Sequence, residues 1–142
     1  MAAIQTLYPS LPILIVDDDE QSLLALAGTL RTAGITNLRT SSDSRVVPTL
    51  LRHEAFSLVL LDLIMPGLAG YEILRRAGEL KSRPPFIIVT GSLPPRDFAA
   101  TLPPDVVDYL EKPVDRERLI VAVRRVLGGS HQGEGVTQCS GT

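Results

Sequence analysis

Five side chains that could do chemistry together each follow a short apolar run of the sequence. Asp17 and Asp18 follow the run ILIV, and Asp62 follows the run SLVLL. Thr90 ends the run FIIVT, and Lys112 comes two residues after VVDYL. Adjacent carboxylates repel one another, so either a cation sits among them or the acids are only a solvated turn and a helix cap. Carboxylates without histidine or cysteine favour a hard cation such as Mg²⁺, which takes oxygen ligands.

These residue types also suit phosphoryl chemistry. A carboxylate beside Mg²⁺ can act as a nucleophile toward phosphorus and give an aspartyl phosphate. Phosphoryl transfer depends mainly on positioning and charge neutralisation. The Lys112 ammonium could neutralise one phosphoryl oxygen, and the Thr90 hydroxyl could donate a hydrogen bond to another. The set therefore predicts Mg²⁺-dependent phosphoryl chemistry, provided that the fold brings the five side chains together.

The apolar runs alternate with amphipathic runs, and this alternation predicts how the side chains are positioned. Strands are predicted over 13–16, 38–41, 57–61, 86–89 and 106–110. Strands that are apolar on both faces and separated by helices predict a doubly wound parallel sheet with helices on both faces. Ligands bind such an α/β sheet beyond the carboxyl ends of its strands. All five side chains fall at that edge.

Other acids are better explained as helix caps than as chemistry. Asp19, Asp43 and Asp115 each precede an amphipathic run, and aspartate is a favoured N-cap residue. The third helix is predicted over Tyr71–Leu80. The arginines of the last helix are interpreted as its solvated face, and the sequence gives no reason to place a nucleic-acid site there.

Proline restricts the fourth helix. The pairs Pro94-Pro95 and Pro103-Pro104 leave only about Arg96–Leu102 able to form a helix, because proline breaks helix interiors.

Length and composition indicate one domain without a membrane or nucleic-acid role. The chain has 142 residues, 44% of them hydrophobic, and a net charge of −2. No apolar run approaches the roughly 18 residues of a membrane span, and the start lacks the features of a signal peptide. Cys139 is the only cysteine, so no internal disulfide can form. We expect a soluble cytoplasmic protein with an N-terminal tail (1–10), one domain (11–127) and a flexible tail or linker start (128–142).

Four motifs in this order and spacing resemble the receiver domain of two-component response regulators. They are VDDD (16–19), LLDLIMPGLAG (60–70), IIVTG (87–91) and DYLEKP (108–113). The resemblance covers Leu11 to about Leu127. It implies a flavodoxin-like, five-stranded parallel sheet with strand order 2-1-3-4-5, similar to that of chemotaxis regulators.

The resemblance also implies a role for each matching residue. Asp62 matches the phospho-accepting aspartate, while Thr90 and Lys112 match the switch hydroxyl and the lysine that grips the phosphoryl group. Asp17 and Asp18 match the acidic pair that holds Mg²⁺ together with Asp62. The remaining matches are the Ile64 backbone carbonyl as a further Mg²⁺ ligand, Tyr109 as the aromatic switch residue, and Pro113 as the family's cis-proline.

The sequence departs from the family pattern at a few positions. Ala69 stands where the family often has aspartate, and little effect is expected because that acid is not catalytic. Ile64 and Ser92 occupy positions that modulate the lifetime of the phosphate in the family. The proline pairs alter the fourth helix, which belongs to the family's usual dimerising face. The resemblance therefore allows a homodimer, but its usual geometry is not implied.

The resemblance implies a signalling domain of a phosphorelay and not an enzyme with a separate substrate. A sensor histidine kinase or phosphotransfer protein would donate the phosphoryl group to Asp62. The surface of the fourth helix, last strand and last helix would then change its preference for an effector or output domain, which the sequence does not identify. One alternative is a phosphatase of the haloacid dehalogenase type with Asp17 as nucleophile, but it leaves Asp62 unexplained. Another is a degenerate receiver that acts only as a binding module.

Overall fold

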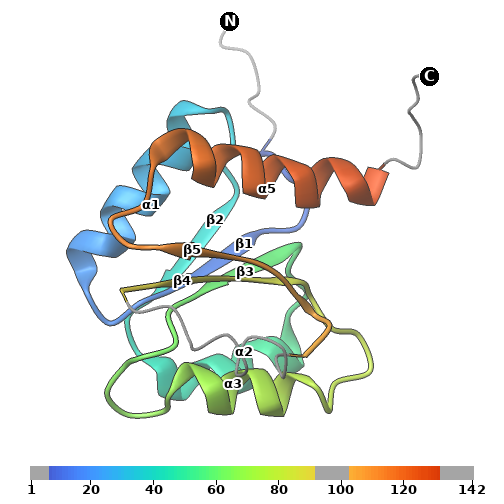
Figure 1. Ribbon diagram of the computed structural model, residues 1–142. Coiled ribbons are helices and arrows are strands. Elements are labelled where there is room, and N and C mark those ends of the chain that lie inside the picture. Colours follow the sequence, from blue (N-terminus) through green and yellow to red (C-terminus); the bar gives the residue numbers. More distant parts are fainter. Residues whose placement is uncertain (1–6, 92–102, 132–142) are drawn as a thin grey trace, which may run out of the picture.

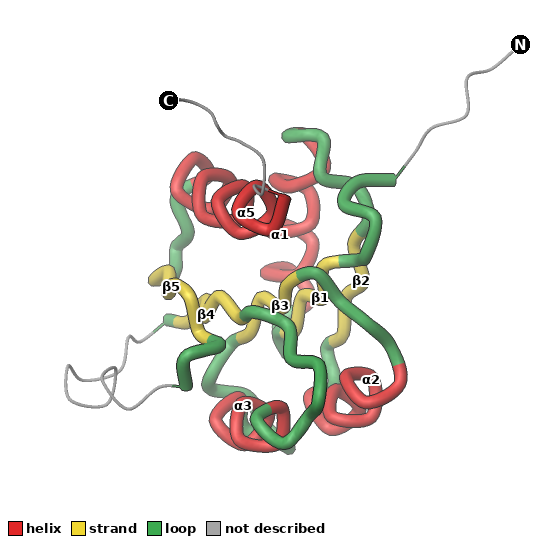
Figure 2. The backbone as a smooth tube through the Cα atoms, turned by 90° about the vertical axis from the view of Figure 1, so that its right-hand side faces the viewer, coloured by secondary structure: helices red, strands yellow, loops and turns green. Residues whose placement is uncertain are grey.

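The computed structural model of the protein describes residues 7–91 and 103–131, and side chains as far as residue 128. A single parallel sheet has the strand order β2-β1-β3-β4-β5 (Figure 1 and Figure 2). The strands are β1 (Ile13–Val16), β2 (Leu38–Ser41), β3 (Leu58–Leu61), β4 (Phe86–Thr90) and β5 (Val106–Glu111). This order confirms the predicted flavodoxin-like, doubly wound sheet.

Burial follows the position of each strand in the sheet. Every residue of β1, β3 and β4 is buried, as the continuous apolar runs predict. The two edge strands differ, because β2 and β5 each keep exposed residues. Asp17 follows β1, Asp62 follows β3 and Thr90 ends β4. These three side chains are therefore positioned by the most buried strands of the sheet.

Helices cover both faces of the sheet. In Figure 1 and Figure 2, α1 (Glu20–Thr32) and α5 (Arg116–His131) lie on one face, and α2 (Val47–His53) and α3 (Gly70–Ala77) lie on the other. The sheet is therefore the middle of three layers, as the predicted alternation of strands and helices requires.

Alternate residues of β1 serve the two faces of the sheet. Ile13 and Ile15 pack in one buried cluster, together with Leu30 of α1 and Val123 of α5. Leu14 and Val16 pack in the opposite cluster, together with Leu51 of α2 and Ile73 of α3. The sheet therefore divides the core into two parts, and both parts hold the central strands in place.

The helix caps agree with the sequence in two cases and differ slightly in the third. The side chain of Asp19 accepts a hydrogen bond from the Gln21 backbone N–H at the start of α1, and Asp115 accepts one from the Arg118 N–H at the start of α5. Asp43 caps a short 3-10 helix, η1 (Ser44–Val46), that precedes α2.

Two helices differ from the prediction at their ends. The sequence predicts a third helix over Tyr71–Leu80, whereas α3 begins at Gly70 and ends at Ala77, just before Gly78. The sequence also predicts a tail from Gly128, whereas α5 continues to His131. Glycine costs about 1 kcal/mol in a helix relative to alanine but, unlike proline, keeps its N–H donor. Gly128 can therefore continue a helix that is already formed.

The N-terminal residues 8–10 are held by the loop that precedes β2. The Tyr8 carbonyl accepts hydrogen bonds from the backbone N–H groups of Thr36 and Asn37, at 2.7 and 2.9 Å. The Asn37 side-chain amide donates to the carbonyls of Pro9 and Ser10, at 2.9 and 3.1 Å. The predicted tail over 1–10 therefore packs on the domain from Tyr8 onward.

The predicted fourth helix over 96–102 lies outside the described residues. Within the described ranges, no helix is both long and apolar enough to cross a membrane.

Candidate functional site

Three carboxylates meet at the carboxyl edge of the sheet. Asp17 and Asp18 follow β1, and Asp62 follows β3, which is the neighbour of β1. One carboxylate oxygen from each of the three lies within 4.8 Å of the others. Asp17 and Asp62 are buried, whereas Asp18 is exposed. This donor set consists of oxygen ligands only, which fits a hard divalent cation such as Mg²⁺.

Lys112 bridges two of the carboxylates from the end of β5. Its ammonium Nζ lies 2.5 Å from Asp17 Oδ2 and 3.1 Å from Asp62 Oδ2. Burial alone would lower the pKa of Lys112, but its hydrogen bonds to Asp17 and Asp62 raise that pKa above its usual value. Lys112 therefore stays charged, and three carboxylates with one ammonium leave a formal charge that a divalent cation would balance.

Asp17 is the most buried acid of the cluster. Burial raises the pKa of Asp17, and the hydrogen bonds from Lys112 and from the Asp19 backbone N–H, at 2.9 Å, oppose that rise. The nearby charge of Asp62 raises the pKa of Asp17 further. The carboxylate of Asp17 therefore depends on a neighbouring positive charge.

Thr90 ends β4 at the same edge of the sheet and is 1% exposed. Within the part of the chain that the structure describes, its buried Oγ1 has no hydrogen-bond partner. Leaving a buried hydroxyl unpaired costs about 1–3 kcal/mol. The Thr90 hydroxyl could therefore donate a hydrogen bond to a ligand oxygen, and that bond would relieve the free-energy cost of its burial.

The loop after Asp62 approaches the strand end closely. Asp62 Oδ1 accepts a hydrogen bond from the Ile64 backbone N–H at 3.1 Å, and the Ile64 side chain is 62% exposed. A Cβ at Gly70 would lie 2.4 Å from the Asp62 carbonyl oxygen. Only glycine fits there without a shift of the backbone. Ala69 is the N-cap residue of α3.

The remaining predicted residues lie on and after β5. Tyr109 pairs with Ile88 of β4 and keeps 37% of its surface exposed. The peptide bond between Lys112 and Pro113 is cis. Ser92 lies outside the described residues.

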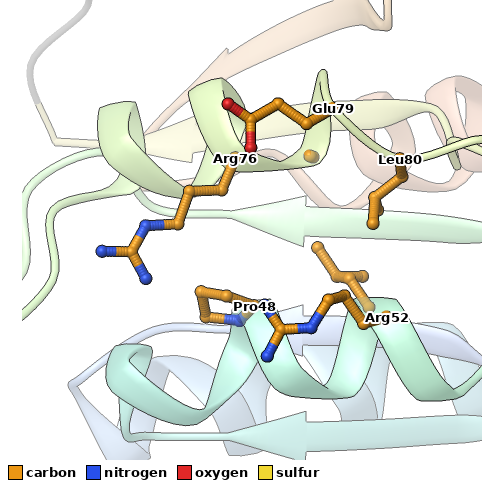
Figure 3. Close-up of a pocket in the computed structure, with 7 residues that line it drawn as sticks. Pro48, Arg52, Arg76, Glu79 and Leu80 are labelled. Atoms are coloured by element: carbon orange, nitrogen blue, oxygen red, sulfur yellow. The ribbon is translucent and has the colours of Figure 1, made fainter.

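Two hollows between the described helices lie away from the acids or at their margin. One of about 190 Å³ lies between α2 and α3, where Figure 3 shows Pro48, Arg52, Arg76 and Leu80 around it. Its lining includes none of the side chains singled out for chemistry. Another, of about 280 Å³, lies between α1 and the start of α5 and includes Lys112 in its lining.

Sequence reasoning missed Ser44, which is buried and bonded to the loop after Asp62. Its polar surroundings, SSDSR, indicate only a turn. No local pattern marks a bond to residues more than 20 positions away.

The fold and the acidic edge together define the class of protein, and comparison of the chain with known proteins gives the same class. Residues 13–124 match the family profile described as response regulator receiver domain. The chain therefore belongs to the receiver domain family of two-component response regulators. Receiver domains are signalling domains that generally bind Mg²⁺ at an acidic pocket. Response regulators receive phosphoryl groups from histidine kinases and often carry effector domains.

Individual relatives differ in how much of their length the chain spans. Protein PilH of Pseudomonas aeruginosa is 35% identical over 119 residues, with 82% of this chain and 98% of PilH covered. The C4-dicarboxylate transport transcriptional regulatory protein DctD of the same organism is 33% identical over 81% of this chain, but only 25% of DctD is covered. A CheY-like receiver domain protein from Methanospirillum hungatei has a TM-score of 0.75 at 27% identity, covering 87% of this chain and 98% of that one.

Proposed function

We propose that Asp62 accepts a phosphoryl group and that the other residues of the acidic edge support this reaction. The observation that carries the proposal is the convergence of three carboxylates and Lys112 at the edge where the Thr90 hydroxyl is unpaired among the described residues. The donor would be a phosphohistidine of a sensor histidine kinase or of a phosphotransfer protein.

The transfer forms one bond and breaks another. A carboxylate oxygen of Asp62 forms a bond to phosphorus, and the phosphorus–nitrogen bond of the donor histidine breaks. The imidazole nitrogen leaves with the electron pair and takes up a proton. The Lys112 Nζ lies 3.1 Å from Asp62 Oδ2 before the transfer. It would contact the new phosphoryl oxygens and neutralise part of their charge.

Asp17, Asp18, Asp62 and the Ile64 carbonyl would hold Mg²⁺. When bound, the ion would neutralise charge on the phosphoryl oxygens. Asp17 and Asp18 follow β1, whereas Asp62 and Ile64 follow β3. The relative position of these two strand ends would therefore decide the affinity for the ion.

Thr90 and Tyr109 would carry the signal away from the site. The Thr90 hydroxyl would donate a hydrogen bond to a phosphoryl oxygen, which satisfies a buried group that has no partner among the described residues. Movement of Thr90 would let the partly exposed Tyr109 turn inward, and the surface of β5 and α5 would change its preference for an effector.

Incubation with acetyl phosphate and Mg²⁺, followed by intact mass, tests the proposal. One added phosphoryl group is expected on the unchanged protein, and none on Asp62→Asn. Asp19→Asn is the control, because Asp19 is an exposed cap residue of the neighbouring loop. Modification that persists in Asp62→Asn but is lost in Asp17→Asn would assign the nucleophile to the end of β1 and contradict the proposal.

A further inference from the structure

Ser44 is a buried polar residue that lies between two loops of the acidic edge. It begins η1 and is 2% exposed. Its hydroxyl donates a hydrogen bond to the Pro66 carbonyl at 3.3 Å and accepts one from the Leu68 backbone N–H at 2.9 Å. One hydroxyl therefore joins the segment after β2 to the loop after Asp62.

The turn that Ser44 holds is tight. Gly67, between the two bonded residues, has a φ of 84°, in the left-handed region that favours glycine. A Cβ at Gly67 would lie 3.4 Å from Ser44 Oγ and from Arg45 Cγ. The turn thus lies against η1, and the two Ser44 hydrogen bonds join it there.

The other side of Ser44 is tied to the end of β1. The Asp17 backbone N–H donates to the Ser41 carbonyl at 3.2 Å. The Ser41 hydroxyl donates in turn to the Asp43 carbonyl at 3.0 Å. Hydrogen bonds and the short backbone segment 41–44 therefore connect Asp17, through Ser44, to the loop that carries Ile64.

We propose that Ser44 is a positioning residue for the metal site. Its hydroxyl fixes the loop after Asp62 relative to Asp17, and so fixes the spacing of the oxygen ligands that come from the two strand ends. The inference rests on the proposed function, because it assigns Ser44 a part in the same Mg²⁺ site. Residues that orient metal ligands commonly change metal affinity by about 10- to 100-fold when they are mutated.

The test is calorimetric titration of the full chain with Mg²⁺, without a phosphoryl donor. Ser44→Ala removes the hydroxyl, and we expect the dissociation constant for Mg²⁺ to rise about tenfold. Ser44→Thr keeps the hydroxyl and is expected to restore most of the affinity that Ser44→Ala loses. Ser42→Ala is the matched control, because Ser42 is exposed in the same turn.

An unchanged dissociation constant for Ser44→Ala overturns the inference, even if the variant melts at a lower temperature. If Ser44→Ala does not fold, Gly67→Ala disturbs the same turn from the other side and is expected to weaken Mg²⁺ binding similarly. The proposed function is judged separately: Mg²⁺ binding without phosphorylation of Asp62 contradicts that function and leaves the Ser44 comparison valid. A chain that binds no Mg²⁺ contradicts both.

Discussion

The two edges of the sheet use their polar groups differently. At the amino edge, the Asn37 amide and the Tyr8 carbonyl are paired within the chain. At the carboxyl edge, Asp17 and Asp62 are buried close together, and Thr90 Oγ1 is unpaired among the described residues. The polar groups at the amino edge stabilise the fold. Those at the carboxyl edge lower the stability of the unliganded protein, and a bound ligand can relieve that loss.

The largest loss of stability is expected at Gly70, where the backbone passes closest to the end of β3. Gly70→Ala would place a Cβ 2.4 Å from the Asp62 carbonyl oxygen. We expect the free energy of unfolding in urea to fall by about 3 kcal/mol, because the backbone must shift. The control is Gly28→Ala in α1, where the added Cβ meets no described atom within 4 Å beyond its chain neighbours and the backbone of its own helix. Equal effects of the two substitutions would contradict the interpretation.

Removal of the bridging ammonium should have the next largest effect. Lys112→Met leaves Asp17 and Asp62 without their shared partner, and we expect a loss of about 2 kcal/mol in urea unfolding without Mg²⁺. Added Mg²⁺ should restore part of that loss. Lys81→Met, at an exposed lysine, should change little. A loss that Mg²⁺ does not reduce would argue against a cation site.

The amino edge should respond to loss of its amide. Asn37→Ala removes the hydrogen bonds to Pro9 and Ser10, and we expect the free energy of unfolding to fall by about 1.5 kcal/mol. Backbone N–H exchange should quicken at Thr36 and at residue 37. The Phe86 N–H, which bonds Asp105 at the same edge, is the internal control. Unchanged exchange at Thr36 would show that the Asn37 amide does not hold this segment.

The smallest effect should have the opposite sign. Thr90→Val replaces a buried hydroxyl that has no partner among the described residues with a methyl group, and we expect the unmodified protein to gain about 1 kcal/mol in urea unfolding. Destabilisation by Thr90→Val would mean that the hydroxyl is already satisfied, and the contrast between the two edges would then weaken.

The sequence predicts the sheet and the acidic edge because both follow from local patterns. Continuous apolar runs mark β1, β3 and β4, and the strand-end rule places Asp17, Asp62 and Thr90 at one edge. The bonds of Ser44 to Pro66 and Leu68 have no such signal, since they join segments that are distant in the chain. The docking of Tyr8 beside Thr36 is missed for the same reason.

The docking of Tyr8 at the amino edge of the sheet has a practical consequence. Tyr8 lies at the amino edge of the sheet, and Arg124 in the second half of α5 bonds Ala33 at that same edge. A four-residue strand spans about 13 Å, so a label attached at Tyr8 or Arg124 is separated from the acids by the length of the sheet. Immobilising the protein through either position would leave the acidic edge facing solution.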